Sequence, residues 1–127
     1  MSILARIASY LESEGIGVQG ETIFVNQMSD DTPGVLLFED PEGFMQHTNA
    51  DDYYRGSFNI TVRFKSSVEG ESLSNKIFKL IRGQGKTFGE YHVLVAKPEM
   101  LPHSFGRNEG GYVEWLLAFE ISFTVGE

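Results

Sequence analysis

The three histidines and the paired carboxylates are the residues of this chain that could support acid–base catalysis or metal binding. His47, His92 and His103 stand singly, and none has a second histidine at the spacing of a zinc site. There is no cysteine, which excludes disulfides and thiolate-ligated metals. The acidic pairs at 30–31 and 51–52 lack the spacing of an EF-hand calcium loop. We therefore expect no catalytic residue, no metal site and no cofactor.

The segment GQGKT at 83–87 resembles the end of a phosphate-binding P-loop. That motif requires a glycine five residues before Gly85, where Leu80 stands instead. A P-loop also follows a strand and opens a helix, whereas here a predicted helix precedes the segment and a predicted strand follows it. We interpret GQGKT as the turn that ends the helix, not as a nucleotide site.

Charge is unevenly spread along the 127 residues, whose formal net charge is −8. From Arg55 onward nine basic residues accompany eight acidic ones. Residues 7–54 contain no lysine or arginine but ten acidic residues: Glu12, Glu14, Glu21, Asp30, Asp31, Glu39, Asp40, Glu42, Asp51 and Asp52. Binding to nucleic acid through its phosphates needs clustered basic residues, so this pattern disfavours it. The simplest role of these carboxylates is to keep the protein soluble.

Two amphipathic helices are predicted from apolar residues at three- and four-residue spacing. The first has apolar residues at 3, 4, 7, 10 and 11 and ends before Gly15 and Gly17. The second spans about residues 68–82, with Ser66 and Glu69 as a capping box. These helices must pack against the strands to be stable, because both are short.

Five strands are predicted between turn-forming residues. They are ETIFVN at 21–26, GVLLFE at 34–39, SFNITVRFK at 57–65, EYHVLVAKP at 90–98 and YVEWLLAFEISFTV at 112–125. In the last strand the odd positions are apolar, which predicts one buried face, while Leu116 and Ala118 make the even face mixed. The order of elements predicts one α+β domain over residues 1–127, with a mostly antiparallel twisted sheet and both helices packed on one face.

Two long polar loops, at 40–52 and 98–111, contain large apolar residues. Such residues either fold back onto the domain or anchor a protein–protein contact, and the sequence leaves both interpretations open. With one residue of the mixed face of the last strand, they form the set of candidate interface residues: Phe44, Met45, Met100, Leu101, Phe105 and Leu116.

The N-terminal segment MSILARIASYLESEG is not expected to be a signal peptide or a membrane span. It lacks a cationic n-region, and Arg6 and Glu12 interrupt its apolar residues. A chain of 127 residues is long enough to bury a core without disulfides. We therefore expect a folded, soluble, cytosolic protein.

The order of these segments resembles the tail terminator, or tail-to-head joining (minor tail), proteins of long-tailed bacteriophages. VLLFE is followed by an acidic loop that closes on YYRGSFNITVRF. The SLSNKIFKLIRG helix, YHVLVAKP, a loop with proline and glycine, and GYVEWLLAFEISFTV come next. Each segment alone is unspecific. The order and spacing over essentially the whole chain carry the resemblance.

The resemblance implies a structural virion protein and not an enzyme. Members of the family form hexameric rings that bind the last ring of the tail tube, stop its polymerisation and present a surface to the head connector. The implied partners are further copies of the chain, the tail tube protein and the head completion or connector protein. DNA would pass through the channel without specific binding, and no membrane is involved. The implied location is the head-proximal end of the virion tail, after assembly in the cytoplasm of the bacterial host.

An acidic channel wall would repel the phosphates of the passing DNA. From charge and resemblance together we expect part of the acidic segment to line this lumen. The candidate lumen carboxylates are Glu39, Asp40, Glu42, Asp51 and Asp52.

Two alternatives remain open. The chain could be a tail-tube or other joining subunit of related fold, in which the loop at 40–52 reaches a neighbouring copy. A weaker alternative is a small-molecule binding module or enzyme, in which Trp115, Phe119 and Tyr91 line a pocket and His92 is the acid–base residue. No convergent polar group accompanies these residues, which disfavours the second alternative.

Overall fold

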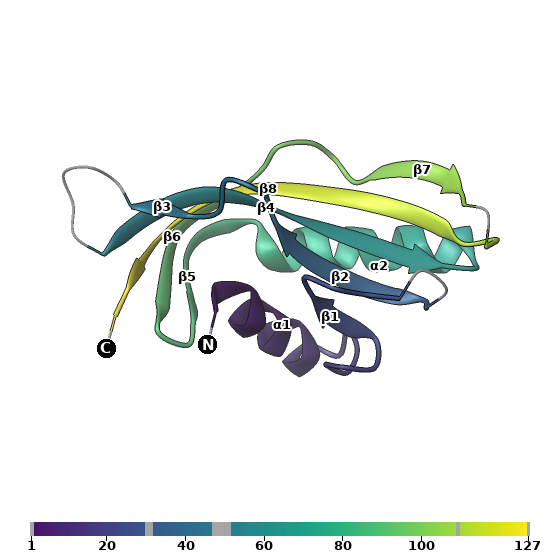
Figure 1. The fold of residues 1–127 in the computed structure, drawn as a ribbon, viewed down its shortest axis with the longest axis horizontal. Helices are drawn as coiled ribbons and strands as arrows, with labels where there is room; N and C mark the ends of the chain where they lie inside the picture. Colours follow the sequence, from purple (N-terminus) through teal and green to yellow (C-terminus); the bar gives the residue numbers. More distant parts are fainter. Residues whose placement is uncertain (1, 30–31, 47–51, 109, 127) are drawn as a thin grey trace.

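The computed structural model describes residues 2–29, 32–46, 52–108 and 110–126 as an arched sheet with one helix below it and a second helix alongside it (Figure 1). The elements are α1 (Ile3–Ser13), β1 (Ile23–Val25), β2 (Gly34–Glu39), β3 (Met45–Gln46), β4 (Tyr53–Phe64), α2 (Ser67–Ile81), β5 (Gly83–Phe88), β6 (Tyr91–Pro98), β7 (His103–Arg107) and β8 (Val113–Val125). The strand order is β1-β2-β4-β8-β6-β5, with β3 added to β4 and β7 added to β8. Among the described strands only β1 and β2 pair in parallel. The predicted α+β fold with a mostly antiparallel sheet is confirmed.

Strands β4 and β8 form the spine of the sheet, since they pair continuously from Tyr53 opposite Thr124 to Phe64 opposite Val113. Their inner face, the face toward the helices, carries the apolar residues that alternate along both strands. The rings of Phe58 and Phe119 stack there with centroids 5.4 Å apart, and the ring of Phe78 from α2 lies 6.3 Å from Phe119. The predicted packing of the last strand against the second helix is therefore confirmed.

The first helix closes the open side of the arched sheet. Ser2 caps it by accepting a hydrogen bond from the Ala5 amide at 3.2 Å. Its buried face packs toward β1 and β2 on one side, and Tyr10 meets Phe88 of β5 on the other with ring centroids 5.1 Å apart. Helix α1 thus connects strands from the two opposite edges of the sheet (Figure 1).

Residues predicted as turn or loop contain three further strands. The segment GQGKT forms most of edge strand β5, so its interpretation as a turn is wrong. The two long loops contain β3 and β7, and β4 begins at Tyr53, four residues before the predicted start. These segments lack apolar alternation, but neighbouring strands supply their backbone hydrogen bonds. Among the described residues neither helix is long and apolar enough to cross a membrane.

Candidate assembly surfaces

Four of the six candidate interface residues are exposed on the folded chain. The exposed fractions are 66% for Met45, 43% for Met100, 76% for Leu101 and 62% for Phe105. Leu116 is half-buried on the outer face of the sheet, the face away from the helices, where it lies between Thr61 of β4 and His103 of β7. These positions leave large apolar groups available to a partner.

Phe44 differs from the other candidates because it packs on its own domain. Its ring meets that of Phe123 edge-on with centroids 5.4 Å apart. It also lies against Gly56 of β4, where an added β-carbon would come within 2.6 Å of the Phe44 ring and 2.7 Å of the Gly43 carbonyl oxygen. Glycine at position 56 therefore permits this close crossing, and Phe44 folds back onto the sheet.

Two β-bulges place apolar side chains on the surface. In β6, Val93 pairs with Phe123 and Val95 with Ser122, so Leu94 is an extra residue, and it is 47% exposed. The bulge in β7 makes Phe105 the extra residue, because Ser104 pairs with Trp115 and Gly106 with Glu114.

A bulge redirects the side chain of the inserted residue without breaking the strand. Gly106 fits this geometry, since its φ of +83° suits glycine.

Leu94 was not among the predicted interface residues. The one signal for it is the apolar run VLV, which breaks the alternation of its strand.

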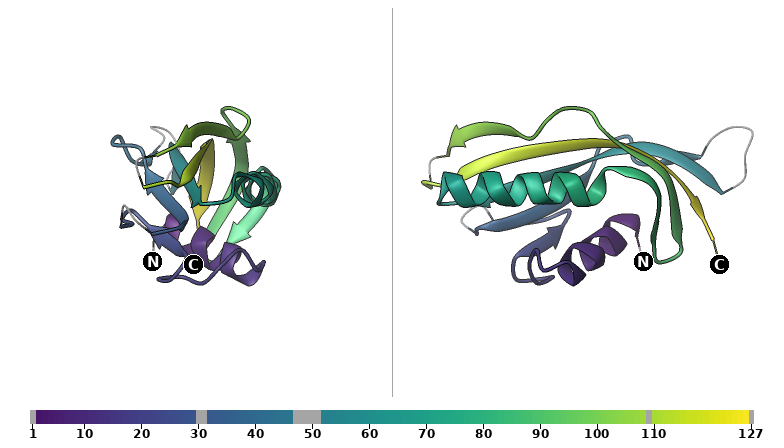
Figure 2. Two further views of the ribbon diagram at one scale, coloured as in Figure 1. Left: turned by 90° about the vertical axis from the view of Figure 1, so that its right-hand side faces the viewer. Right: turned by 180° about the vertical axis from the view of Figure 1, so that it is seen from behind.

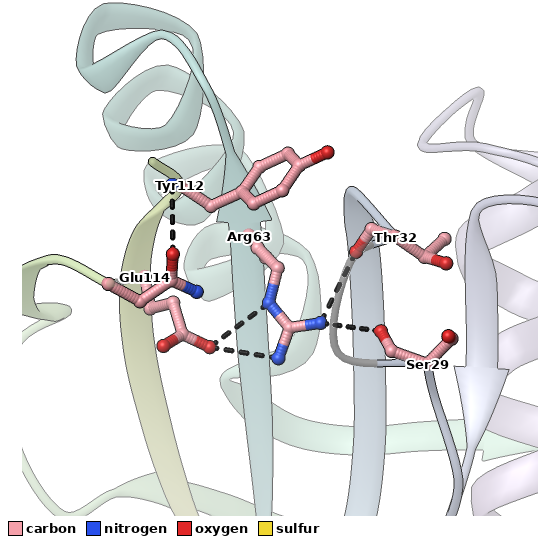
Figure 3. A network of polar contacts seen from close by, with 6 residues as sticks. Ser29, Thr32, Arg63, Tyr112 and Glu114 are labelled. Atoms are coloured by element: carbon pink, nitrogen blue, oxygen red, sulfur yellow. Dashed lines mark hydrogen bonds and ion pairs between the residues drawn. The ribbon is translucent and has the colours of Figure 1, made fainter. Parts of the chain in front are cut away.

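A buried arginine holds the loop before β2 against the outer face of the sheet (Figure 3). The Arg63 guanidinium donates to a Glu114 carboxylate oxygen from Nε at 3.1 Å and from Nη2 at 3.0 Å. Its Nη1 donates to the carbonyl oxygens of Ser29 at 2.8 Å and Thr32 at 3.3 Å. Nearby, the Tyr112 amide donates to the Asn108 side-chain oxygen at 3.0 Å. The charge of Arg63 is thus satisfied within the chain, and alternation alone did not identify this network.

The candidate lumen carboxylates lie on two faces of the sheet. Asp40 accepts a hydrogen bond from Asn59 at 2.7 Å, and with Glu42 it borders an open hollow of about 430 Å³ on the outer face. The same hollow contains the ion pair of Arg55 and Glu120, whose atoms lie 3.2 Å apart.

On the inner face, Glu39 borders a different hollow beside Phe44 and Tyr54. Asp52 is exposed at the start of β4, and Asp51 lies outside the described residues. The described candidate carboxylates therefore do not lie on one common face of the sheet.

The residues proposed for a small-molecule pocket are not brought together. Tyr91 of β6 pairs with Val125 of β8. Trp115 lies ten residues before Val125 on β8, and ten residues span roughly 33 Å at the ordinary rise of a strand. Phe119 is buried in the core, and His92 is exposed. The structure therefore provides no shared pocket for these four residues.

The remaining histidines show no metal site in the described part of the chain. His103 is exposed beside the ring of Phe105, and His47 lies outside the described residues. Within the described ranges no group of three or more histidines and carboxylates could hold a metal ion.

Trp115 is half-buried against the second helix. A β-carbon added at Gly70 of α2 would lie 3.0 Å from its indole nitrogen. Among the described residues this nitrogen has no hydrogen-bond partner. Trp115 therefore fixes the distance between α2 and β8, and we assign it to the fold.

A comparison with known protein families matches residues 10–125 to the family of the bacteriophage tail terminator protein. No curated protein matches the chain.

Proposed function

The chain belongs to the bacteriophage tail terminator family, and from this premise we propose that it forms a ring that closes the head-proximal end of the phage tail tube. The family establishes a structural role in the phage tail and is not a family of enzymes. In our proposal the ring stops polymerisation of the tube and offers its other side to the head connector. The family match over most of the chain is the observation that carries this proposal.

The exposed apolar residues support a role in assembly. Met100, Leu101 and Phe105 lie close together in the sequence, the first two in the connection that crosses the middle of the sheet and Phe105 in β7 toward one end (Figure 1). Met45 of β3 lies toward the other end, because β3 pairs with the first part of β4. We propose that the first group contacts one neighbouring ring or chain and Met45 another, since a joining protein needs separate contacts on separate sides.

A second part of the proposal is that the ring has a channel through which DNA passes, with a wall that does not bind the DNA. The net charge of −8 would keep phosphate from adhering to the ring. Glu39, Asp40, Glu42 and Asp52 remain candidates for its wall, although they occupy two faces of the sheet. In a structure of the assembled ring, carboxylates that face the channel would support this part of the proposal, and carboxylates on the outer rim would contradict it.

Growth of tail tubes in the presence of the protein tests the proposed function. Purified tube subunits should stop elongating when the protein is added, and the mean tube length should fall as its concentration rises. A control with a monomeric protein of similar net charge should leave the length unchanged. Tubes that continue to grow, or long helical tubes formed by this chain alone, would contradict the proposal and favour a tube subunit.

A further inference from the structure

The uneven charge of the sequence becomes a separation of charge in space. The strand order β1-β2-β4-β8-β6-β5 puts strands from the first half of the chain at one edge of the sheet and strands from the second half at the other. In the end-on view, the blue strands β1 and β2 lie on one side of the molecule, and the teal helix α2 lies on the opposite side (Figure 2, left).

The acidic side consists of Glu21, Asp40 and Glu42, beside β1, β2 and β3. Glu21 and Glu42 are exposed and Asp40 is half-buried. The sequence has no lysine or arginine between residues 7 and 54, and Arg55, which borders the same hollow as Asp40 and Glu42, is paired with Glu120. Met45, which is 66% exposed, adds an apolar group to the same side.

The basic side consists of Lys79 of α2, Arg82 directly after this helix, Lys86 of β5 and Lys97 of β6. Lys79, Arg82 and Lys97 are exposed. Between positions 76 and 98 the sequence has one acidic residue, Glu90, which pairs with Arg6 at 2.7 Å. Glu120, which stands opposite Lys97 in the sheet, pairs with Arg55 at 3.2 Å.

The exposed bulge residue Leu94 adds an apolar group to the basic side. Edge strand β5 is irregular at Gly85, whose φ of +68° departs from extended strand geometry. An irregular edge resists strand pairing with another chain, so a contact on this side would use side chains.

We infer that the acidic side of one copy docks against the basic side of the next copy. This inference rests on the proposed ring, and it names the surfaces that join its subunits, which assigns Asp40 and Glu42 to the contact and leaves Glu39 and Asp52 as candidates for the channel wall. Opposite charges on opposite sides favour a head-to-tail contact, the kind that closes into a ring. A two-fold contact through either side would bring like charges together. The partner that fits both sides is therefore a second copy of this chain.

Charge reversal on each side separately tests the inference. The acid-side variant carries Glu21→Lys and Glu42→Lys, and the base-side variant carries Lys79→Glu, Arg82→Glu and Lys97→Glu. All five side chains are exposed and form no ion pair among the described residues, so both variants should fold. Each variant alone presents like charges at the contact, and the concentration needed for half-assembly should rise on the order of tenfold or more.

Mixing the two variants gives the decisive readout. The acid-side variant is basic on both sides and the base-side variant is acidic on both, so a 1:1 mixture should form alternating rings with an even number of subunits. Native mass spectrometry measures their composition. Lys65→Glu reverses an exposed charge just after β4, away from both sides, and should assemble as wild type. Wild-type rings should also dissociate as salt rises, because exposed charges are screened.

Three results would overturn the inference. If both variants form rings as wild type does, these residues lie on the channel wall or the outer rim, and the proposed ring stands. If the mixture assembles no better than either variant alone, the two sides do not meet. If the wild type caps tubes without any contact between copies, both this inference and the proposed ring fail.

Discussion

Phe44 and Phe105 show how one residue type serves the fold at one position and the surface at another. Phe44 lies between Phe123 and Gly56, whereas Phe105 is 62% exposed in a bulge. Both were predicted as candidate interface residues, because sequence shows a large apolar residue in a polar segment but not the surface beneath it.

Alanine substitution should separate these two phenylalanines. Phe44→Ala removes a half-buried ring and should lower the free energy of unfolding by about 2 kcal/mol. Phe105→Ala should change it by less than about 0.5 kcal/mol and instead weaken ring or tube binding. Urea denaturation measures the first effect and sedimentation velocity the second. Equal losses of stability would show that Phe105 also packs in the monomer.

Glu90 should give the stability a measurable dependence on pH. The pKa of this carboxyl is lowered by a hydrogen bond from its own backbone amide and by the Arg6 guanidinium. A lowered folded-state pKa stabilises the protein above the ordinary value of 4.5, and this contribution is lost as pH falls through the folded-state pKa.

The Glu90→Gln variant tests this contribution through its melting temperature. It should melt below wild type at pH 7, and the difference should shrink below pH 4.5. Glu71→Gln, an exposed change on α2, should behave as wild type at both pH values. A difference between Glu90→Gln and wild type that persists unchanged in acid would show that the pair of Arg6 and Glu90 does not stabilise the fold electrostatically.

At the scale of elements, sequence predicts those that bury an apolar face. Both helices and strands β1, β2, β4, β6 and β8 follow from spacing of three to four or of two residues, and β8 alternates as expected. Strands β3, β5 and β7 have no such pattern, because they are held mainly by hydrogen bonds to β4, β6 and β8. Pairings between distant residues, such as Arg63 with Glu114, leave no local signal either. Of the residues predicted at an interface, Met45, Met100, Leu101 and Phe105 are exposed, whereas the exposure of Leu94 was not predicted.

The bulge at Leu94 is expected to serve assembly, not folding. Without Leu94 the pairs of β6 with β8 run without interruption, from Val93 opposite Phe123 to Val95 opposite Ser122. Deleting Leu94 should therefore leave the fold intact, with the free energy of unfolding changed by less than about 1 kcal/mol. The same deletion should weaken ring formation in sedimentation experiments. A deletion variant that unfolds would assign the bulge to the fold, and Val93→Ala, which leaves a gap in the core, provides the destabilised control.

The whole molecule combines one buried face of a sheet with two sides whose exposed residues carry charges of opposite sign. Helices α1 and α2 cover the inner face and leave the outer face, the two edges and the bulged residues to the surface (Figures 1 and 2). A monomer has no need for oppositely charged edges, whereas a ring subunit meets two neighbours with two different sides. The arrangement therefore agrees with a structural part of the tail that acts through assembly.

Electron microscopy of the purified protein mixed with tail tubes tests the central claim most directly. We predict a ring on one end of each tube, the head-proximal end, and separate rings or monomers when tubes are absent. Tubes with both ends bare, or density distributed along their length, would contradict the assignment of this chain as the protein that terminates the tail tube.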